Sequence, residues 1–152
     1  MITTEQIKEL RDKTGISIMQ CRKALEEAEG DMDKALSLLK AKSGEIAEKK
    51  SSRELGAGVV QAYVHSSGTM GALLELNCET DFVAKNPEFK ALAYDLAMQA
   101  AAAGPETVEE FLAQEFIKDS SLTVQMLLQS FVQKFGEKIA LGKFSRLSVL
   151  GR

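Results

Sequence analysis

The stretch that decides the fold is "VVQAYVHSSGTMGALLELNC", residues 59–78. Two runs rich in aliphatic and β-branched residues flank "SSGT", and Gly68 can supply the positive φ that a tight turn requires. This pattern predicts a β-hairpin. The next segment, "NCETDFVAKNPEF" at 77–89, leads from the second strand towards a helix. It carries Asp81 and Phe82 side by side, where connections usually have small polar residues.

A helix is predicted directly after this connection. Asn86 can cap it, Pro87 suits its first turn, and Gly104 ends it. A second helix is predicted over 122–136, and the strand character of the closing segment, 138–150, places that segment beside the hairpin. The result is a small antiparallel sheet covered on one face by helices, an α+β fold. The apolar face of the first helix is formed by Phe89, Leu92, Leu96 and Ala100.

The first forty residues predict a separate unit of three short helices. Thr3 and Gln6 have capping-box spacing before the first helix, and Asp31 can cap the third. Apolar residues recur at helical spacing along all three, which is typical of a miniature bundle. The expected domains are the three-helix bundle at 1–40, a charged, partly helical and solvated linker at 41–55, and the α+β core at 56–152.

The composition is that of a soluble globular protein. The chain has 152 residues, 45% of them hydrophobic and 27% charged, with a net charge of −3 and a pI near 5.3. A nucleic-acid binder that works through bulk charge needs a basic face, so this balance argues against that class. No apolar run reaches the roughly 18 residues that a membrane span requires. The charged N-terminus lacks a signal-peptide core, and we expect the protein to be cytoplasmic.

No arrangement of residues indicates covalent chemistry. His65 is the single histidine, and nothing in the spacing brings it to a nucleophile and an orienting carboxylate. Cys21 and Cys78 form no metal or redox motif, so we expect two reduced thiols. There is no phosphate-binding glycine loop and no cluster with metal-ligand spacing. We therefore expect no cofactor and no metal, and a binding protein rather than an enzyme.

Two segments carry a resemblance to a known family. "LRDKTGISIMQCRKALEEAEGDMDKAL" at 10–36 and "LELNCETDFVAKNPEF" at 74–89 strongly resemble elongation factor Ts of bacteria and organelles. Two later segments, 116–129 and 135–147, look like the C-terminal part of that family. The resemblance implies a ubiquitin-associated-type domain at the N-terminus, followed by the α+β core. It also implies guanine-nucleotide exchange on the GTPase elongation factor Tu during translation elongation.

The resemblance further implies which residues contact the GTPase. The "TDF" element of the family corresponds to Thr80, Asp81 and Phe82, and Val83 follows it. In the family the aromatic ring wedges between helices of the nucleotide domain and disturbs the Mg²⁺ site and the phosphate loop. Because Mg²⁺ and oriented amides hold the phosphates, factor and nucleotide would oppose each other's binding. The N-terminal contacts of the family correspond to Arg11, Ile18 and Met19.

This chain departs from the longer members of that family. The resemblance implies that those members have a duplicated core and a coiled-coil hairpin inserted before the C-terminal part. This chain has only a short connector, residues 104–114, at the place of that insertion. A homodimer through the core sheet could rebuild the missing half, because a three-stranded sheet has two edges open to pairing. The sequence leaves the oligomeric state open.

Other interpretations also stay open at this point. Phe82 could pack on its own domain beside Phe89 and Leu92, and Asp81 could cap the local turn. The protein could be an adaptor whose bundle binds a ubiquitin-like or peptide ligand, with the sheet as scaffold. It could also be a thiol enzyme, which would require a cysteine with a strongly lowered pKa.

Overall fold

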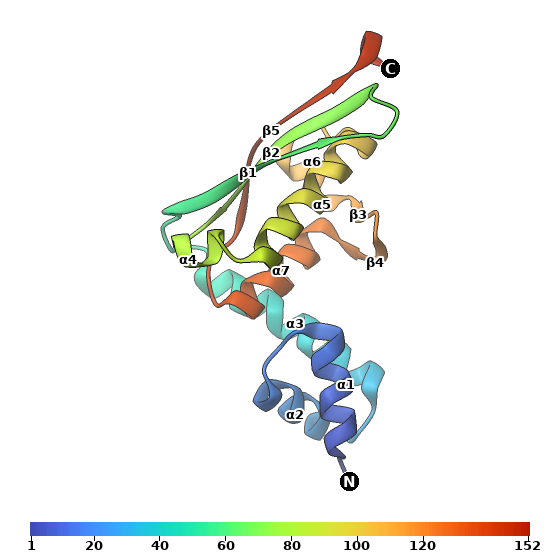
Figure 1. Cartoon of the computed structure of the whole chain (residues 1–152). Helices are drawn as coiled ribbons and strands as arrows, with labels where there is room; N and C mark the ends of the chain where they lie inside the picture. The colour runs from blue at the N-terminus through green and yellow to red at the C-terminus, as the bar shows by residue number, and fades with distance from the viewer.

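The computed structural model describes residues 1–152 and places a small helical bundle at one end of a larger α+β unit (Figure 1). The bundle contains α1 (Thr4–Thr14), α2 (Ile18–Glu27) and the first half of α3 (Met32–Lys50). The larger unit contains an antiparallel sheet of three strands and the helices that cover it. The α+β fold class predicted from the sequence is therefore confirmed.

Helices α1 and α3 of the bundle begin at the residues predicted to cap them. The Thr3 hydroxyl accepts a hydrogen bond from the Gln6 N–H (3.1 Å), and the Gln6 side chain accepts one from the Thr3 N–H (2.9 Å). This reciprocal pair is a capping box. Helix α1 ends at Gly15, whose φ of +71° favours glycine, and the Asp31 carboxylate caps α3. The three helices enclose a core of nine buried residues.

Helix α3 extends further than the sequence indicated. We expected a partly helical, solvated linker over 41–55; the helix continues to Lys50, and its second half packs on the larger unit instead of being solvated. Ser43 is buried there, where its hydroxyl bonds Leu39 O (3.0 Å) and contacts the side-chain oxygen of Gln133. Tertiary packing therefore sustains a helix that the Ser-Gly step alone would weaken. The apolar side chains in this contact are Ile46 and Ala47.

The sheet of the larger unit has the order β1–β2–β5, with both pairs antiparallel. Strands β1 (Ala57–Val64) and β2 (Met70–Cys78) form the predicted hairpin, whose turn uses Gly68 at a φ of +70°. Strand β5 (Ala140–Ser148) pairs with β2, as its strand character predicted. A bulge interrupts this pair at Gly142, where an added Cβ would collide with the side chain of Glu75 on β2.

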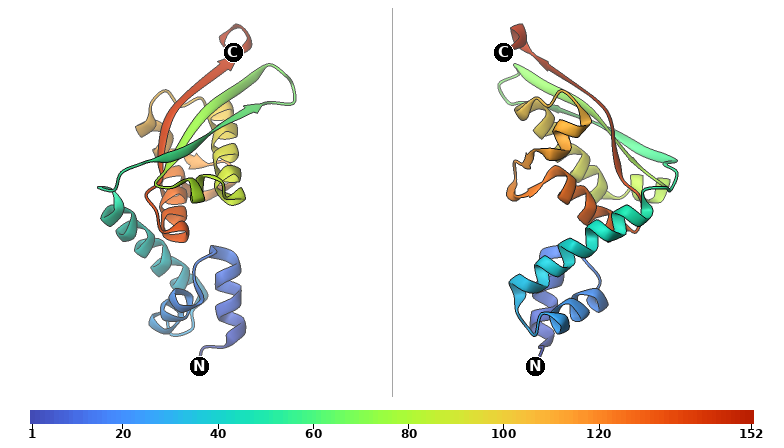
Figure 2. Two further views of the ribbon diagram at one scale, coloured as in Figure 1. Left: turned by 60° about the vertical axis from the view of Figure 1, so that its left-hand side comes forward. Right: turned by 180° about the vertical axis from the view of Figure 1, so that it is seen from behind.

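Two helices, α5 (Pro87–Ala103) and α7 (Val124–Phe135), cover one face of the sheet and leave the other bare (Figure 2). Asn86 caps α5, and Gly104 ends it in the left-handed conformation, both as predicted. A core of 20 buried residues fills the space between the sheet and the helices. The smaller elements are α4 (Asp81–Ala84), α6 (Val108–Ala113), β3 (Glu115–Phe116), β4 (Asp119–Thr123) and a single 3₁₀ turn, η1 (Val149–Gly151).

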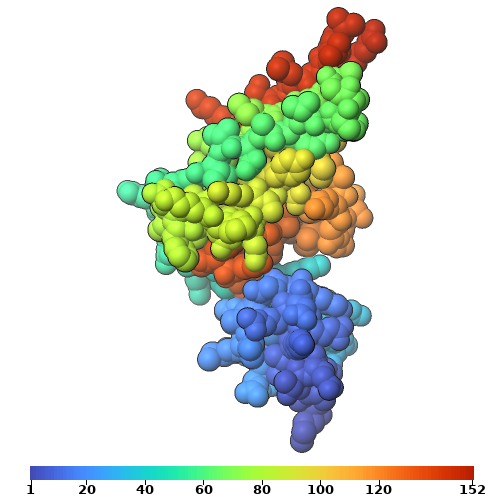
Figure 3. Space-filling model, in the orientation of Figure 1, coloured from blue at the N-terminus to red at the C-terminus, as the bar shows by residue number.

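The bundle and the larger unit meet at a narrow waist where α3 lies against α7 (Figure 3). Gln133 of α7 contacts Ser43 and also lies 3.5 Å from the side chain of Gln20 in α2. Gly15 approaches Lys134 so closely that an added Cβ would stand 2.9 Å from the lysine Cε. The placement of the bundle therefore depends on one shared helix and a small polar seam.

Candidate partner-binding site

Residues 80–83, which the sequence singled out, lie at the short helix α4 between β2 and α5. Thr80 is the N-cap of this helix, because its backbone is extended and its hydroxyl accepts from the Val83 N–H at 3.4 Å. The cap is thus Thr80 and not Asp81. Asp81 occupies the first turn, where the free N–H groups of a helix start stabilise a carboxylate.

Phe82 projects from α4 into solvent, with 85% of the residue exposed. A staple on its own domain would bury the ring, so the structure excludes that interpretation. Its neighbour Val83, also predicted from the resemblance to contact the partner, is only 3% exposed and packs in the main core. The two consecutive residues therefore differ in environment: Val83 packs in the core, and Phe82 faces solvent.

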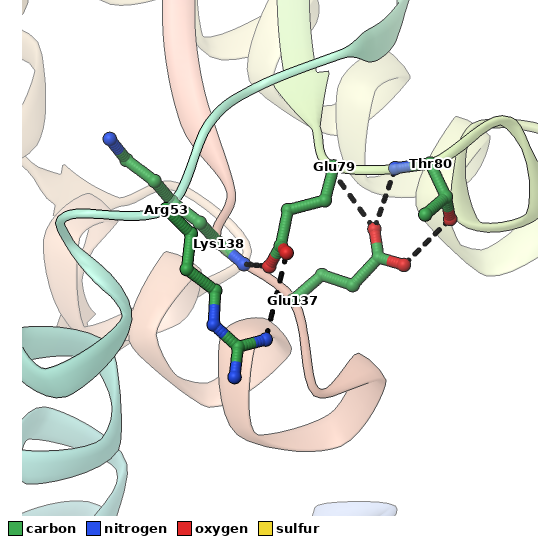
Figure 4. A network of polar contacts seen from close by, with 5 residues as sticks. All are labelled: Arg53, Glu79, Thr80, Glu137 and Lys138. Carbon is green, nitrogen blue, oxygen red and sulfur yellow. Dashed lines mark hydrogen bonds and ion pairs between the residues drawn. The ribbon is translucent and has the colours of Figure 1, made fainter.

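The carboxylate of Glu137 holds the backbone that leads into α4 (Figure 4). Its Oε1 accepts from the Glu79 N–H (3.1 Å) and the Thr80 N–H (3.0 Å), and its Oε2 accepts from the Thr80 hydroxyl (2.6 Å). Glu137 follows Gly136, the residue that ends α7 with a φ of +74°. One half-buried carboxylate therefore satisfies three donors of the turn, and charged acceptors make the stronger hydrogen bonds.

Glu79 in turn accepts a hydrogen bond from the segment that carries Glu137. Its Oε2 accepts from the backbone N–H of Lys138 at 2.5 Å, and its Oε1 lies 3.6 Å from Nη1 of Arg53 (Figure 4). The connection after β2 and the connection after α7 are thus joined in both directions. We call this set of contacts, made by Arg53, Glu79, Thr80, Glu137 and Lys138, the carboxylate clamp.

Sequence reasoning did not find the carboxylate clamp. Glu79 and Glu137 stand 58 positions apart, and acidic residues at element ends usually face water. The only local signal was the position of each glutamate, one directly before the "TDF" element and one directly after the glycine that ends a helix. Such a signal predicts exposure as readily as a long-range contact.

Cys78 lies beneath the same turn as a buried, free thiol. Its Sγ is 3.3 Å from the carbonyl oxygen of Thr80. Burial raises the pKa of the Cys78 thiol, and the nearby carboxylates of Glu137 and Asp81 raise it further. Burial also raises the pKa of Cys21 in the bundle core. Neither thiol has the lowered pKa that a nucleophilic cysteine requires, which argues against a thiol enzyme.

A second exposed surface lies at the loop between α1 and α2. Ile18 and Met19 are 54% and 79% exposed, and Arg11 is exposed on the last turn of α1. Buried Ile16 anchors this loop from beneath, and the Ser17 hydroxyl caps α2. The loop and α4 lie on the same side of the molecule, the left-hand side in Figure 1. The elements that carry the predicted contacts Ile18, Met19 and Phe82 therefore lie on a common side.

The remaining polar groups suggest no further chemistry. His65 is exposed, and its Nδ1 lies 2.9 Å from the Ser67 hydroxyl within the hairpin turn, with no carboxylate beside it. No three histidine, cysteine or acidic side chains gather in an arrangement that could hold a metal ion. No helix has both the length and the apolar character needed to cross a membrane.

The chain matches a family model described as Elongation factor TS over residues 79–152, which includes the carboxylate clamp residues Glu79, Thr80, Glu137 and Lys138. It is also similar to proteins named Elongation factor Ts. The relative from Carboxydothermus hydrogenoformans is 40% identical over 194 aligned residues, which cover 98% of this chain and 89% of the relative. The relative from Desulforamulus reducens is 39% identical, with 95% and 88% covered.

A third relative shows how length varies among these proteins. The protein named Elongation factor Ts from Clostridium kluyveri is 42% identical over 149 residues, which cover 98% of this chain but only 49% of the relative. The alignment with the shorter relative from Carboxydothermus runs over 194 residues, more than the 152 of this chain, so that relative carries inserted residues.

Proposed function

Because this chain belongs to the elongation factor Ts family, we propose that it acts in translation elongation by promoting the release of GDP from elongation factor Tu. The observation that carries the proposal is Phe82, an almost fully exposed ring on a short helix whose N-cap is bound by Glu137 and whose Val83 is buried in the core. Such a ring is suited to enter a gap between helices of the GTPase. The activity belongs in the cytoplasm, where translation takes place.

The proposed mechanism is displacement without covalent chemistry. Phe82 enters the GTPase between two of its helices, and the adjacent Asp81 carboxylate accepts hydrogen bonds at the rim of the same gap. The insertion shifts the groups that hold Mg²⁺ and the nucleotide phosphates, and these groups supply much of the hold on GDP. Factor and nucleotide then weaken each other's binding by the same factor, as linkage requires. In this mechanism the protein is an exchange factor rather than an enzyme, and it needs no cofactor of its own.

We propose that the N-terminal unit binds the GTPase and that the larger unit promotes nucleotide release. Arg11, Ile18 and Met19 at the loop between α1 and α2 supply a charged and an adaptable apolar contact to the GTPase. Docking on this loop raises the effective concentration of the ring at its gap, because both surfaces belong to one chain. The proposed division of tasks places docking in residues 1–40 and exchange in residues 56–152.

We also propose that the protein forms a homodimer through its core sheet. The face of the sheet opposite α5 and α7 is uncovered (Figure 2) and carries exposed aliphatic side chains on all three strands. A second copy could cover this face, which would bring two cores together. Sedimentation equilibrium tests this point, and a single species of monomer mass at micromolar concentration would rule it out. The exposed aliphatic residues are Val60, Val64, Leu73 and Leu147.

The test of the central proposal is the release of fluorescent GDP from purified elongation factor Tu. We expect this chain to accelerate release strongly and in proportion to its concentration until it saturates. If it bound the GTPase without accelerating release, the adaptor interpretation would replace the exchange function. If it neither bound nor accelerated release, the proposed partner would be wrong.

A further inference from the structure

We propose that Glu137 is a positioning residue for exchange: its carboxylate sets the direction in which α4 presents the Phe82 ring. The inference rests on the proposed exchange function and adds a residue that does not itself touch the partner. Glu137 acts through Thr80, the cap of α4.

The first step is the double role of the Thr80 hydroxyl. It donates to Glu137 Oε2 at 2.6 Å and accepts from the Val83 N–H at 3.4 Å. A hydroxyl that donates in one direction and accepts in the other has a fixed orientation. Glu137 therefore orients the group that caps α4, and it also fixes the backbone before the helix through the Thr80 N–H at 3.0 Å.

The second step is the shortness of α4. The helix contains four residues, Asp81–Ala84, and a single helical turn has no stability of its own. Its conformation depends on what holds its ends. Val83 is buried in the main core on one side, and Glu137 binds Thr80 on the other. Phe82 lies between these two attachments, so its Cα–Cβ direction is set by both.

The third step is that Glu137 is itself held in place. It stands in the tight connection between α7 and β5, and the next residue, Lys138, donates its N–H to the Glu79 carboxylate. Arg53 lies 3.6 Å from the same carboxylate and offsets part of the negative charge. The carboxylate clamp therefore joins two connections that would otherwise move independently, and the exposed ring gains a rigid base.

The expected consequence is a loss of preorganisation without a loss of contact area. In Glu137→Ala the ring remains exposed, but the turn samples several directions before binding, and ordering it then opposes association. Hydrogen bonds to a charged acceptor are among the stronger ones, so stimulated GDP release should fall roughly 10-fold. The fall should appear only while the Phe82 ring is present.

A double-mutant cycle tests whether Glu137 acts through Phe82. Stimulated release of fluorescent GDP is measured for the unaltered chain, Glu137→Ala, Phe82→Ala and the double variant. We expect Glu137→Ala to slow release in the first background and to change nothing further in the Phe82→Ala background. An equal loss in both backgrounds, or no loss in either, would overturn the proposal.

Asp119→Ala is the matched control. The Asp119 carboxylate also accepts from a backbone N–H and a hydroxyl, those of Ser121 at 3.1 and 2.6 Å, but it stands at β4, away from α4. This variant should exchange like the unaltered chain. A loss equal to that of Glu137→Ala would mean that removing any carboxylate that holds a turn slows exchange, and it would remove the special role of Glu137.

Amide hydrogen exchange of the free protein separates this inference from the proposed function. Glu137→Ala should raise the exchange rates of the Glu79 and Thr80 amides and leave those of α1 and α2 unchanged. If the unaltered chain failed to accelerate GDP release, the proposed function would be wrong, while the amide rates would still decide whether Glu137 holds the turn. Should Glu137→Ala unfold the larger unit, Glu137→Gln keeps one acceptor oxygen and should give intermediate rates. Unchanged amide rates in Glu137→Gln and Glu137→Ala would refute the inference.

Discussion

Replacing Phe82 by alanine should separate exchange from stability. The ring is 85% exposed, so its loss should alter the free energy of unfolding by no more than about 0.5 kcal/mol. Exchange should suffer far more, because truncating an aromatic anchor at an interface typically costs about 2–4 kcal/mol. With a factor of ten for about every 1.4 kcal/mol, stimulated GDP release should fall roughly 30- to 1,000-fold.

Phe89→Ala is the matched control within the same segment. Phe89 is fully buried, and its ring packs edge to face with Phe135 at a centroid distance of 6.3 Å. Its truncation should open a cavity and destabilise the protein by about 3–5 kcal/mol. At about 2–4 °C per kcal/mol for a chain of this size, the melting temperature should drop by roughly 6–20 °C.

The assay combines thermal melting with stopped-flow release of fluorescent GDP on both variants. Phe82→Ala should melt with the unaltered chain and exchange poorly, and Phe89→Ala should melt early. Below its melting temperature, Phe89→Ala should still exchange. The reasoning fails if Phe82→Ala melts several degrees lower, or if it releases GDP at the normal rate.

Three further predictions address other parts of the molecule. The isolated chain should bind neither GDP nor GTP, so calorimetry should show only the heat of dilution; micromolar binding would contradict the proposed mechanism. A fragment from Ala41 onward should bind the GTPase more weakly than the full chain and should still speed exchange at high concentration. It should also melt at a higher temperature than a fragment from Ser52, which lacks the second half of α3. Equal melting temperatures would show that this half of α3 does not stabilise the core. Because burial raises the pKa of Cys21 and Cys78, their contribution to stability should be complete below the unfolded thiol value of 9.0 and should fall as pH rises through the raised values. Stability that stayed level as pH rose above that value, or native thiols that reacted rapidly with an aromatic disulfide at neutral pH, would oppose this account.

The sequence predicted the elements whose signals are local. Thr3 and Gln6 lie three residues apart and form the capping box, and Gly68 adopts the positive φ of the hairpin turn. The helix that begins after Asn86 ends at Gly104, as its flanking residues indicated. Each of these features depends on contacts within a few residues, which a linear pattern can carry.

The features that the sequence did not predict depend on distant contacts. The continuation of α3 requires α7, because Ser43 bonds a residue 90 positions away. The carboxylate clamp requires Glu79 and Glu137 to meet across two connections. The spacing of apolar residues could not indicate which of Phe82 and Val83 faces the core, because helix α4 has only four residues and is too short to show a helical period.

Helix α3 fixes an angle as well as a distance between the loop that joins α1 to α2 and the exposed Phe82 ring, because it starts in one core and ends against the other. Each α-helical residue adds about 1.5 Å and a rotation of roughly 100°. One residue inserted near Lys42 would therefore rotate the loop between α1 and α2 by about 100° around the helix axis and turn it away from the side of the molecule that carries α4. Seven inserted residues would return it to within about 20° of its bearing and about 10 Å further out. Proteins with this architecture can thus change their reach only in steps close to whole turns of this helix.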